Sequence, residues 1–196
     1  MDALLARAWD YARSRLGAER LLHTEGTVEE ARRLAVLFGA SPEKAEVAAV
    51  LHDIARDIPA RDLLRAARSK GIMVRTIDSL HPVLLHGKVA AAEAALLGVE
   101  DLEILHAISS HGTGRPGWTS LEKTLYLADK VEKSRSYPGV ERLRELVRLG
   151  EPEMALREAL REAVIYALRN EPGFVDPETV VVLNEVSQGL SRSTES

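Results

Sequence analysis

Cysteine is absent from this chain of 196 residues. That absence excludes a disulfide framework, a zinc site built on cysteine, an iron–sulfur cluster and a thiol nucleophile. The chain has six histidines, so any metal site must be built from histidines and carboxylates. The length favours a single domain, which can bury a core without a disulfide or a structural metal.

Long basic runs and long apolar runs are also missing. The 26 Lys and Arg residues against 30 Asp and Glu residues give a net charge of −4, which argues against a general nucleic-acid-binding surface. The longest apolar stretch, Ala163 to Leu168, has six residues, whereas a membrane span needs roughly 18. Charges also interrupt the first residues, where a signal peptide would be apolar. We therefore expect a cytoplasmic protein with neither nucleic-acid nor membrane partners.

Apolar residues recur at three- and four-residue spacing along nearly the whole chain, which predicts an all-α protein. Residues 179–183 have high β propensity, but they follow a good helix start, so we predict a helix there. Residues 72–80 are expected to form a loop that positions His81. Helix starts, glycines and prolines divide the rest into predicted helices at about 1–16, 20–38, 42–52, 60–69, 82–97, 101–110, 120–133, 139–149, 152–170 and 177–190.

These helices predict one helical bundle over residues 18–190, with an N-terminal helix over residues 1–17 packed on the core and a frayed tail over residues 191–196. The predicted helix at 152–170 carries an apolar stripe. Core packing and a homodimer interface would explain this stripe equally well. Its members are Met154, Leu156, Leu160, Val164 and Leu168.

The pair His52-Asp53 ends an apolar helical run over residues 47–51. Burying an imidazole beside a carboxylate is costly without a partner, and a divalent cation would relieve that cost because both groups are metal ligands. The pair is a weak signal alone, so it needs ligands from elsewhere. Separate predicted helices supply candidates, namely His23, His86, His111 and Asp129.

Two histidines lie outside this set. His106 is five residues before His111, which places it about 140° away around a regular helix, so we expect a surface or packing role. His81 lies five residues before His86, but Pro82 intervenes. His81 could therefore approach the site from a loop, as a substrate contact or a proton donor.

In their order along the chain, the candidate ligands resemble those of the HD-domain metal-dependent phosphohydrolases, and more narrowly of the YqeK-type branch. The resemblance covers roughly residues 18–185. The sequence departs from the pattern at Arg56, where many relatives have lysine, and at residues 130–135, where an isoleucine–glutamate–proline run is common. The strings that carry the resemblance are AAVLHDIA at 48–55, HGKV at 86–89, HGTGRP at 111–116, LEKTLYLAD at 121–129 and YPGV at 137–140.

The resemblance implies a single HD-domain bundle with two divalent metal ions. One ion would be held by His23, His52, Asp53 and Asp129, and a second by His86 and His111, with Asp53 bridging the two. Iron is the first expectation, and manganese, cobalt, nickel and zinc also suit such ligands. The implied reaction is symmetrical hydrolysis of diadenosine tetraphosphate (Ap4A) to two ADP by a metal-bridged hydroxide, with Asp53 and Asp129 as catalytic residues.

A four-phosphate substrate brings about four negative charges to a chain that is itself at −4, so local cations must bind it. Arg115, on a glycine-rich loop beside His111, is the first candidate. The other candidate substrate contacts are Lys88, Arg135, Arg56 and His81. Arg56 could equally form an ion pair with Asp57.

Three alternatives stay open from the sequence. Another HD-type nucleotide phosphohydrolase, such as a nucleoside 5′-monophosphatase or an alarmone hydrolase, would use the same ligands. A module that senses nucleotides without turnover would also keep a metal site. A purely structural helical protein would need none of these residues.

Overall fold

The computed structural model describes residues 2–170 and 173–193, and all regular elements in this part of the chain are helical. The prediction of an all-α protein is therefore confirmed. The helices are α1 (Asp2–Arg15), α2 (Ala18–Phe38), α3 (Pro42–Leu51), α4 (Ala60–Ser69), α5 (Thr76–Leu80), the 3₁₀ helix η1 (Pro82–Leu85), α6 (His86–Leu96), α7 (Leu102–Ser110), α8 (Ser120–Val131), α9 (Val140–Arg148), α10 (Pro152–Arg169) and α11 (Pro177–Ser193).

Local signals in the sequence set several of these helix ends. The Ser41 side chain caps α3 by accepting a hydrogen bond from the Lys44 amide, and Pro42 follows at the first helical position. Thr119 and Glu122 form the expected capping box at the start of α8. Gly39 ends α2 in the left-handed region at φ 70°, where the absence of a Cβ removes the steric penalty.

Two segments differ from the prediction. Residues 76–80, expected as part of a loop, form α5, because the Asp78 carboxylate accepts hydrogen bonds from both the amide and the guanidinium of Arg75. The helix expected over 82–97 is divided into η1 and α6 at His86. There the His86 ring donates to the Val83 carbonyl oxygen at 2.6 Å.

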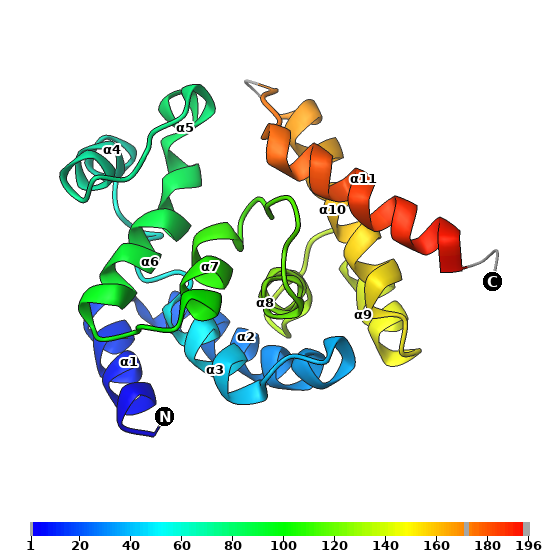
Figure 1. Ribbon diagram of the computed structural model, residues 1–196, viewed down its shortest axis with the longest axis horizontal. Helices are drawn as coiled ribbons and strands as arrows, with labels where there is room; N and C mark the ends of the chain where they lie inside the picture. The colour runs from blue at the N-terminus through cyan, green and yellow to red at the C-terminus, as the bar shows by residue number, and fades with distance from the viewer. Residues whose placement is uncertain (1, 171–172, 194–196) are drawn as a thin grey trace.

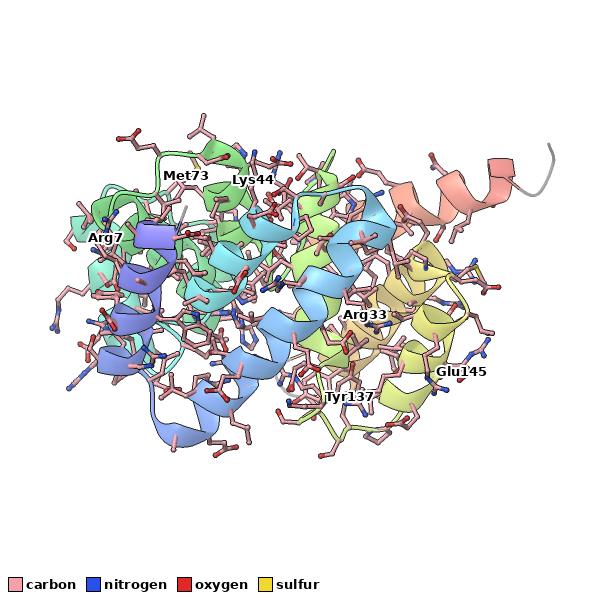
Figure 2. All side chains as sticks on the ribbon, turned by 90° about the horizontal axis from the view of Figure 1, so that it is seen from below. Arg7, Arg33, Lys44, Met73, Tyr137 and Glu145 are labelled. Atoms are coloured by element: carbon pink, nitrogen blue, oxygen red, sulfur yellow. The ribbon has the colours of Figure 1, made fainter. Side chains whose placement is uncertain are left out.

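Helices α2 and α8 pack against each other at the centre of the molecule, and α3 and α7 complete this central layer. Helices α4 and α5 lie at one end of the molecule, and α9, α10 and α11 lie at the other (Figure 1). Seen from below, α2 runs diagonally across the face, with α1 on one side and α9 on the other (Figure 2). Most of the candidate ligands therefore lie on or directly after the helices of this central layer.

Helix α10 uses its apolar stripe mainly inside the molecule. Leu156 and Leu160 are buried in the core, Met154 packs against it, and Leu168 is exposed. Core packing thus accounts for most of the stripe, and a homodimer stays a prediction. None of the described helices combines the length and apolarity that a membrane crossing requires.

The predicted division of the chain at residues 17 and 190 also stays a prediction. Ala8 and Ala12 of α1 are buried, and this helix packs on α3. Helix α11 continues through residues 191–193, which were expected to fray. Residues 194–196, the rest of the predicted tail, lie outside the described residues.

Candidate metal centre

Six candidate ligands from five parts of the bundle meet at one buried point. They are His23 in α2, His52 and Asp53 at the end of α3, His86 at the start of α6, His111 at the end of α7 and Asp129 in the last turn of α8. All six side chains are buried. The sequence placed them on separate helices, and the structure brings all of them together.

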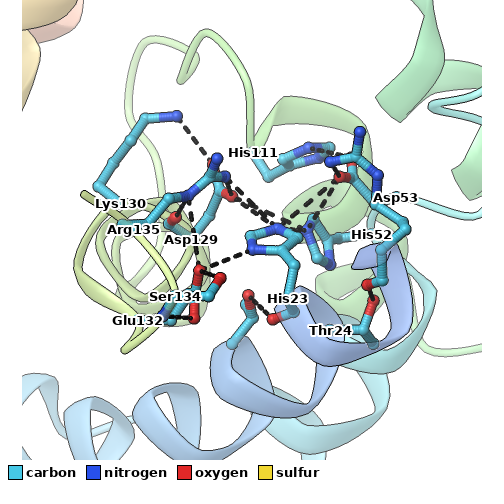
Figure 3. A network of polar contacts seen from close by, with 12 residues as sticks. His23, Thr24, His52, Asp53, His111, Asp129, Lys130, Glu132, Ser134 and Arg135 are labelled. Carbon is cyan, nitrogen blue, oxygen red and sulfur yellow. Dashed lines mark hydrogen bonds and ion pairs between the residues drawn. The ribbon is translucent and has the colours of Figure 1, made fainter. Parts of the chain in front are cut away.

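The first group of ligands surrounds the Nε2 atom of His23. This atom lies 3.1 Å from Asp129 Oδ1 and 3.2 Å from His52 Nε2. Asp53 Oδ2 approaches His23 Nε2 at 3.8 Å and His52 Nε2 at 3.7 Å. Figure 3 shows these rings and carboxylates facing a common space.

The second group shares Asp53 with the first. His86 Nε2 and His111 Nε2 lie 2.9 Å apart. The other carboxylate oxygen, Asp53 Oδ1, lies 3.3 Å from His86 Nε2 and 3.5 Å from His111 Nε2. Asp53 therefore turns one oxygen to each group, which is the arrangement required of a bridging carboxylate.

Backbone carbonyls fix the tautomer of three of the rings. His52 Nδ1 contacts the Ala49 oxygen at 2.7 Å, and His111 Nδ1 contacts the Ile108 oxygen at 2.8 Å. His86 makes the equivalent bond to Val83. Because a carbonyl only accepts, each Nδ1 carries the proton, and each Nε2 turns its lone pair toward the centre.

Lone pairs that face one another repel, so the donor set fits a divalent cation better than direct contact between the rings. Burial lowers the pKa of His52 to about 4, against the pull of Asp53. It also lowers the pKa of His86. Both imidazoles are therefore neutral at pH 7, which is the form that binds metal.

The fourth ring, that of His23, is held by Glu132, a residue that the sequence analysis did not single out. Its Oε1 atom lies 3.0 Å from His23 Nδ1, and its side chain is fully buried. Gly26 makes room for this carboxylate, because a Cβ added there would lie 2.3 Å from Glu132 Oε2. An acid three residues after Asp129, past the end of an apolar helix, was the available signal.

Cations lie against the oxygens of both aspartates. Arg20 Nη1 is 3.1 Å from Asp53 Oδ2, and Lys130 Nζ is 2.8 Å from Asp129 Oδ2. Arg135 contacts Asp129 Oδ1 directly. Burial alone would raise the pKa of Asp129, but Lys130, His23 and Arg135 hold that pKa well below its usual range. The sequence analysis missed Arg20, although it stands one helical turn before His23.

A cavity of ≈ 630 Å³ opens onto the ligand cluster, and we refer to it as the first cavity. Three predicted substrate contacts, Arg56, His81 and Arg135, line it. The ring of His81 packs edge-on against Phe174, with centroids 5.6 Å apart. Asp57, the predicted partner of Arg56, instead approaches Arg20 at 3.4 Å.

The other two predicted contacts, Arg115 and Lys88, are not among the residues that line this cavity. Buried carboxylates hold both cations. Arg115 Nη2 donates to Glu122 Oε2 at 2.9 Å, and Lys88 Nζ donates to Asp78 Oδ2 at 2.9 Å. Each acid is almost fully buried, so it requires a cation beside it. His106 is exposed, as expected.

The sequence model of the HD domain family matches residues 20–134, which contain all six candidate ligands. A Bacillus subtilis (strain 168) protein named bis(5′-nucleosyl)-tetraphosphatase, symmetrical, is 35% identical over 90% of this chain and 94% of its own length. A protein of the same name from Halalkalibacterium halodurans is 33% identical over 92% and 95%.

A solved structure is similar to this chain over nearly its whole length. A predicted HD superfamily hydrolase involved in NAD metabolism from Clostridium acetobutylicum superposes with a TM-score of 0.87 at 29% identity, over 93% of this chain and 96% of that one. The chain belongs to the HD domain family and, within it, to the family of the symmetrical bis(5′-nucleosyl)-tetraphosphatases. It is a hydrolase.

Proposed function

We propose that the protein hydrolyses Ap4A symmetrically to two ADP with the aid of divalent metal ions. The observation that carries the proposal is the pair of buried ligand groups that share Asp53 beside a cavity bordered by cations. The names of the curated relatives support the choice of substrate.

His23, His52, Asp53 and Asp129 would hold one ion, and His86, His111 and Asp53 would hold a second. Iron is the first expectation among the divalent metals that suit nitrogen and oxygen ligands, which also include manganese, cobalt, nickel and zinc. When bound, the ions supply a water of lowered pKa and positive charge for the phosphoryl oxygens.

The chain itself binds and orients the substrate. Asp53 sets the separation of the two ligand groups, and Asp129 lies where it can orient the attacking water. Arg20, Lys130 and Arg135 reach this point, and their charges offset the roughly four negative charges of the polyphosphate. The apolar wall of the first cavity, which includes Val83, Leu84 and Phe174, excludes water around a nucleoside.

The test is product analysis with a matched pair of aspartate variants. The wild-type protein, isolated with its metal, is expected to convert Ap4A to two ADP. Asp53→Ala should lower kcat/KM at least ~100-fold and reduce the metal content, since it removes a ligand from both groups. Asp10→Asn, at an exposed carboxylate on α1, should change neither.

Three results would overturn the proposal, and the first two concern activity. One is release of inorganic phosphate from nucleoside monophosphates without cleavage of Ap4A, which would indicate the 5′-monophosphatase alternative. The other is full activity in Asp53→Ala. A protein that binds Ap4A but releases no product would instead be a nucleotide-sensing module.

A further inference from the structure

A second cavity, of ≈ 600 Å³, adjoins the ligand cluster. It lies between the start of α2 and the loop after α8, and its walls include Ala18, Ser136 and Tyr137. Arg20 and Arg135 line both this second cavity and the first. The two cavities therefore meet at these two arginines.

The candidate metal ligands are divided between the same two spaces. His86, His111, Asp53 and Asp129 border the first cavity, whereas His23 borders the second. The ligand cluster thus lies at the junction of the cavities. A linear substrate that passes this junction has room on both sides of the reacting bond.

Symmetrical cleavage imposes a requirement on that room. A dinucleoside tetraphosphate cut at its midpoint gives two halves of equal size, each a nucleoside with two phosphates. If the midpoint lies at the metal centre, each half needs a space of the same order on its own side. Volumes of ≈ 630 and ≈ 600 Å³ meet this requirement and fall within the usual range for small-molecule sites.

Resting on the proposed function, we propose that the second cavity binds the second nucleoside diphosphate half of the substrate. Arg20 and Arg135 then lie between the halves, where they bind the central phosphates. The Tyr137 hydroxyl donates to the Lys130 carbonyl oxygen at 2.9 Å, which fixes an aromatic ring in the wall of this cavity. Such a ring offers a face for a nucleobase to stack on.

The experiment compares two substrates in a blocked variant. Ala18 is exposed and lines the second cavity, so Ala18→Trp fills that space from the first turn of α2. Val36→Trp is the control, because Val36 is 70% exposed on the same helix, about 27 Å further along. The substrates are Ap4A and adenosine 5′-tetraphosphate, which lacks the second nucleoside and can place its adenosine in the first cavity.

We expect Ala18→Trp to lower kcat/KM for Ap4A about tenfold, the loss of one stacked base, while kcat/KM for adenosine 5′-tetraphosphate stays within about twofold. Val36→Trp should change neither. An equal loss on both substrates, or a loss on neither, would overturn the inference. Retained activity on adenosine 5′-tetraphosphate also shows that the variant is folded.

A second measurement needs no activity. Calorimetric titration of the metal-loaded protein with ADP should give two sites per chain, and Ala18→Trp should give one. A single site in the wild-type protein would contradict the inference. If wild-type protein fails to cleave Ap4A at all, the proposed function fails first, so the two failures are distinguishable.

Discussion

Each of the four histidines of the candidate metal centre donates its Nδ1 proton to a different partner, and only His23 donates to a carboxylate. Glu132 supplies that carboxylate at 3.0 Å. Partners of this kind fix the ring and raise its basicity, and their loss typically costs 10–100-fold in metal affinity. We expect Glu132→Ala to weaken metal binding in this range, as measured by competition with a chelator.

Glu132→Gln separates this effect from a general structural role. The amide oxygen can still accept from His23 Nδ1, so the glutamine variant should recover most of the affinity lost in Glu132→Ala. Glu25→Ala, at an exposed acid on α2, serves as the control and should leave the affinity unchanged. If Glu132→Ala binds metal as tightly as the wild type, Glu132 does not contribute to metal binding.

His52 makes the stability of the metal-free protein depend on pH. Its pKa is about 4 in the folded chain, because of burial, and about 6.5 in an unfolded one. The unfolded state thus takes up a proton first as the pH falls. The contribution of His52 to the free energy of unfolding is therefore fully present above pH 6.5. It is lost as the pH falls toward 4, and the loss amounts to roughly 3 kcal/mol.

Denaturant unfolding of chelated protein at pH 7 and pH 5 would measure this dependence. His86 adds to it, since burial lowers its pKa too. His23 opposes it, because Asp129 raises the pKa of that ring despite burial. His52→Asn should flatten the profile, and His106→Asn, at an exposed site, should not. A wild-type profile that is flat between pH 7 and pH 5 would contradict the assignment.

At the scale of whole elements, one guanidinium joins the two ends of the molecule. Arg75, at the start of α5, lies 2.9 Å from Asp78 Oδ1 and 2.5 Å from Asp176 Oδ2, just before α11. Both aspartates are buried, and the contacts of Arg75 and Lys88 lower the pKa of Asp78 to about 2 despite its burial. The bond to Asp176 also holds in place a residue that lines the first cavity.

Arg75→Ala leaves two buried carboxylates short of a partner, so we expect the free energy of unfolding at pH 7 to fall by about 1–3 kcal/mol. Arg75→Lys should recover part of it, since a lysine meets only one carboxylate well. Arg61→Ala, at an exposed α4 residue, should change it by less than about 0.5 kcal/mol. Urea unfolding would measure all three variants. An Arg75→Ala variant with the same free energy of unfolding as the wild type would show that the pairing does not stabilise the fold.

The contacts of Arg75 illustrate which helices could be predicted from the sequence and which could not. Caps and breakers are local, so the bounds of α4 and the start of α8 follow from neighbouring residues. Helix α5 begins at a local capping pair, Arg75 and Asp78, whose arginine is not a usual N-cap residue. The contact of Arg75 with Asp176, 101 residues away in sequence, is one that no local pattern reports. The pairing of Arg115 with Glu122 was not foreseen for a similar reason, because Glu122 was interpreted only as a cap and its need for a cation was not considered.

At the scale of the whole molecule, the candidate ligands connect five helices that are otherwise held by apolar packing. Residue type and position on the predicted helices singled out His52, Asp53 and the other candidate ligands, most of which lie near the end of a helix. Their convergence depends on how α2, α3, α6, α7 and α8 cross, which periodicity does not specify. Metal binding at this point should therefore stabilise the whole bundle.

Metal removal tests this coupling. A ligand that binds only the folded state at 100 times its Kd adds about 2.7 kcal/mol, and a domain of this size shifts its Tm by about 2–4 °C for each kcal/mol. We therefore expect chelation at pH 7 to lower Tm by roughly 5–10 °C, and added metal to restore it. Arg75→Ala should show the same chelator shift from a lower starting Tm, because its contacts lie outside the ligand groups. Metal analysis must first show that the protein was loaded. If chelation then leaves Tm unchanged, the five helices hold the ligands in place without help from the ions.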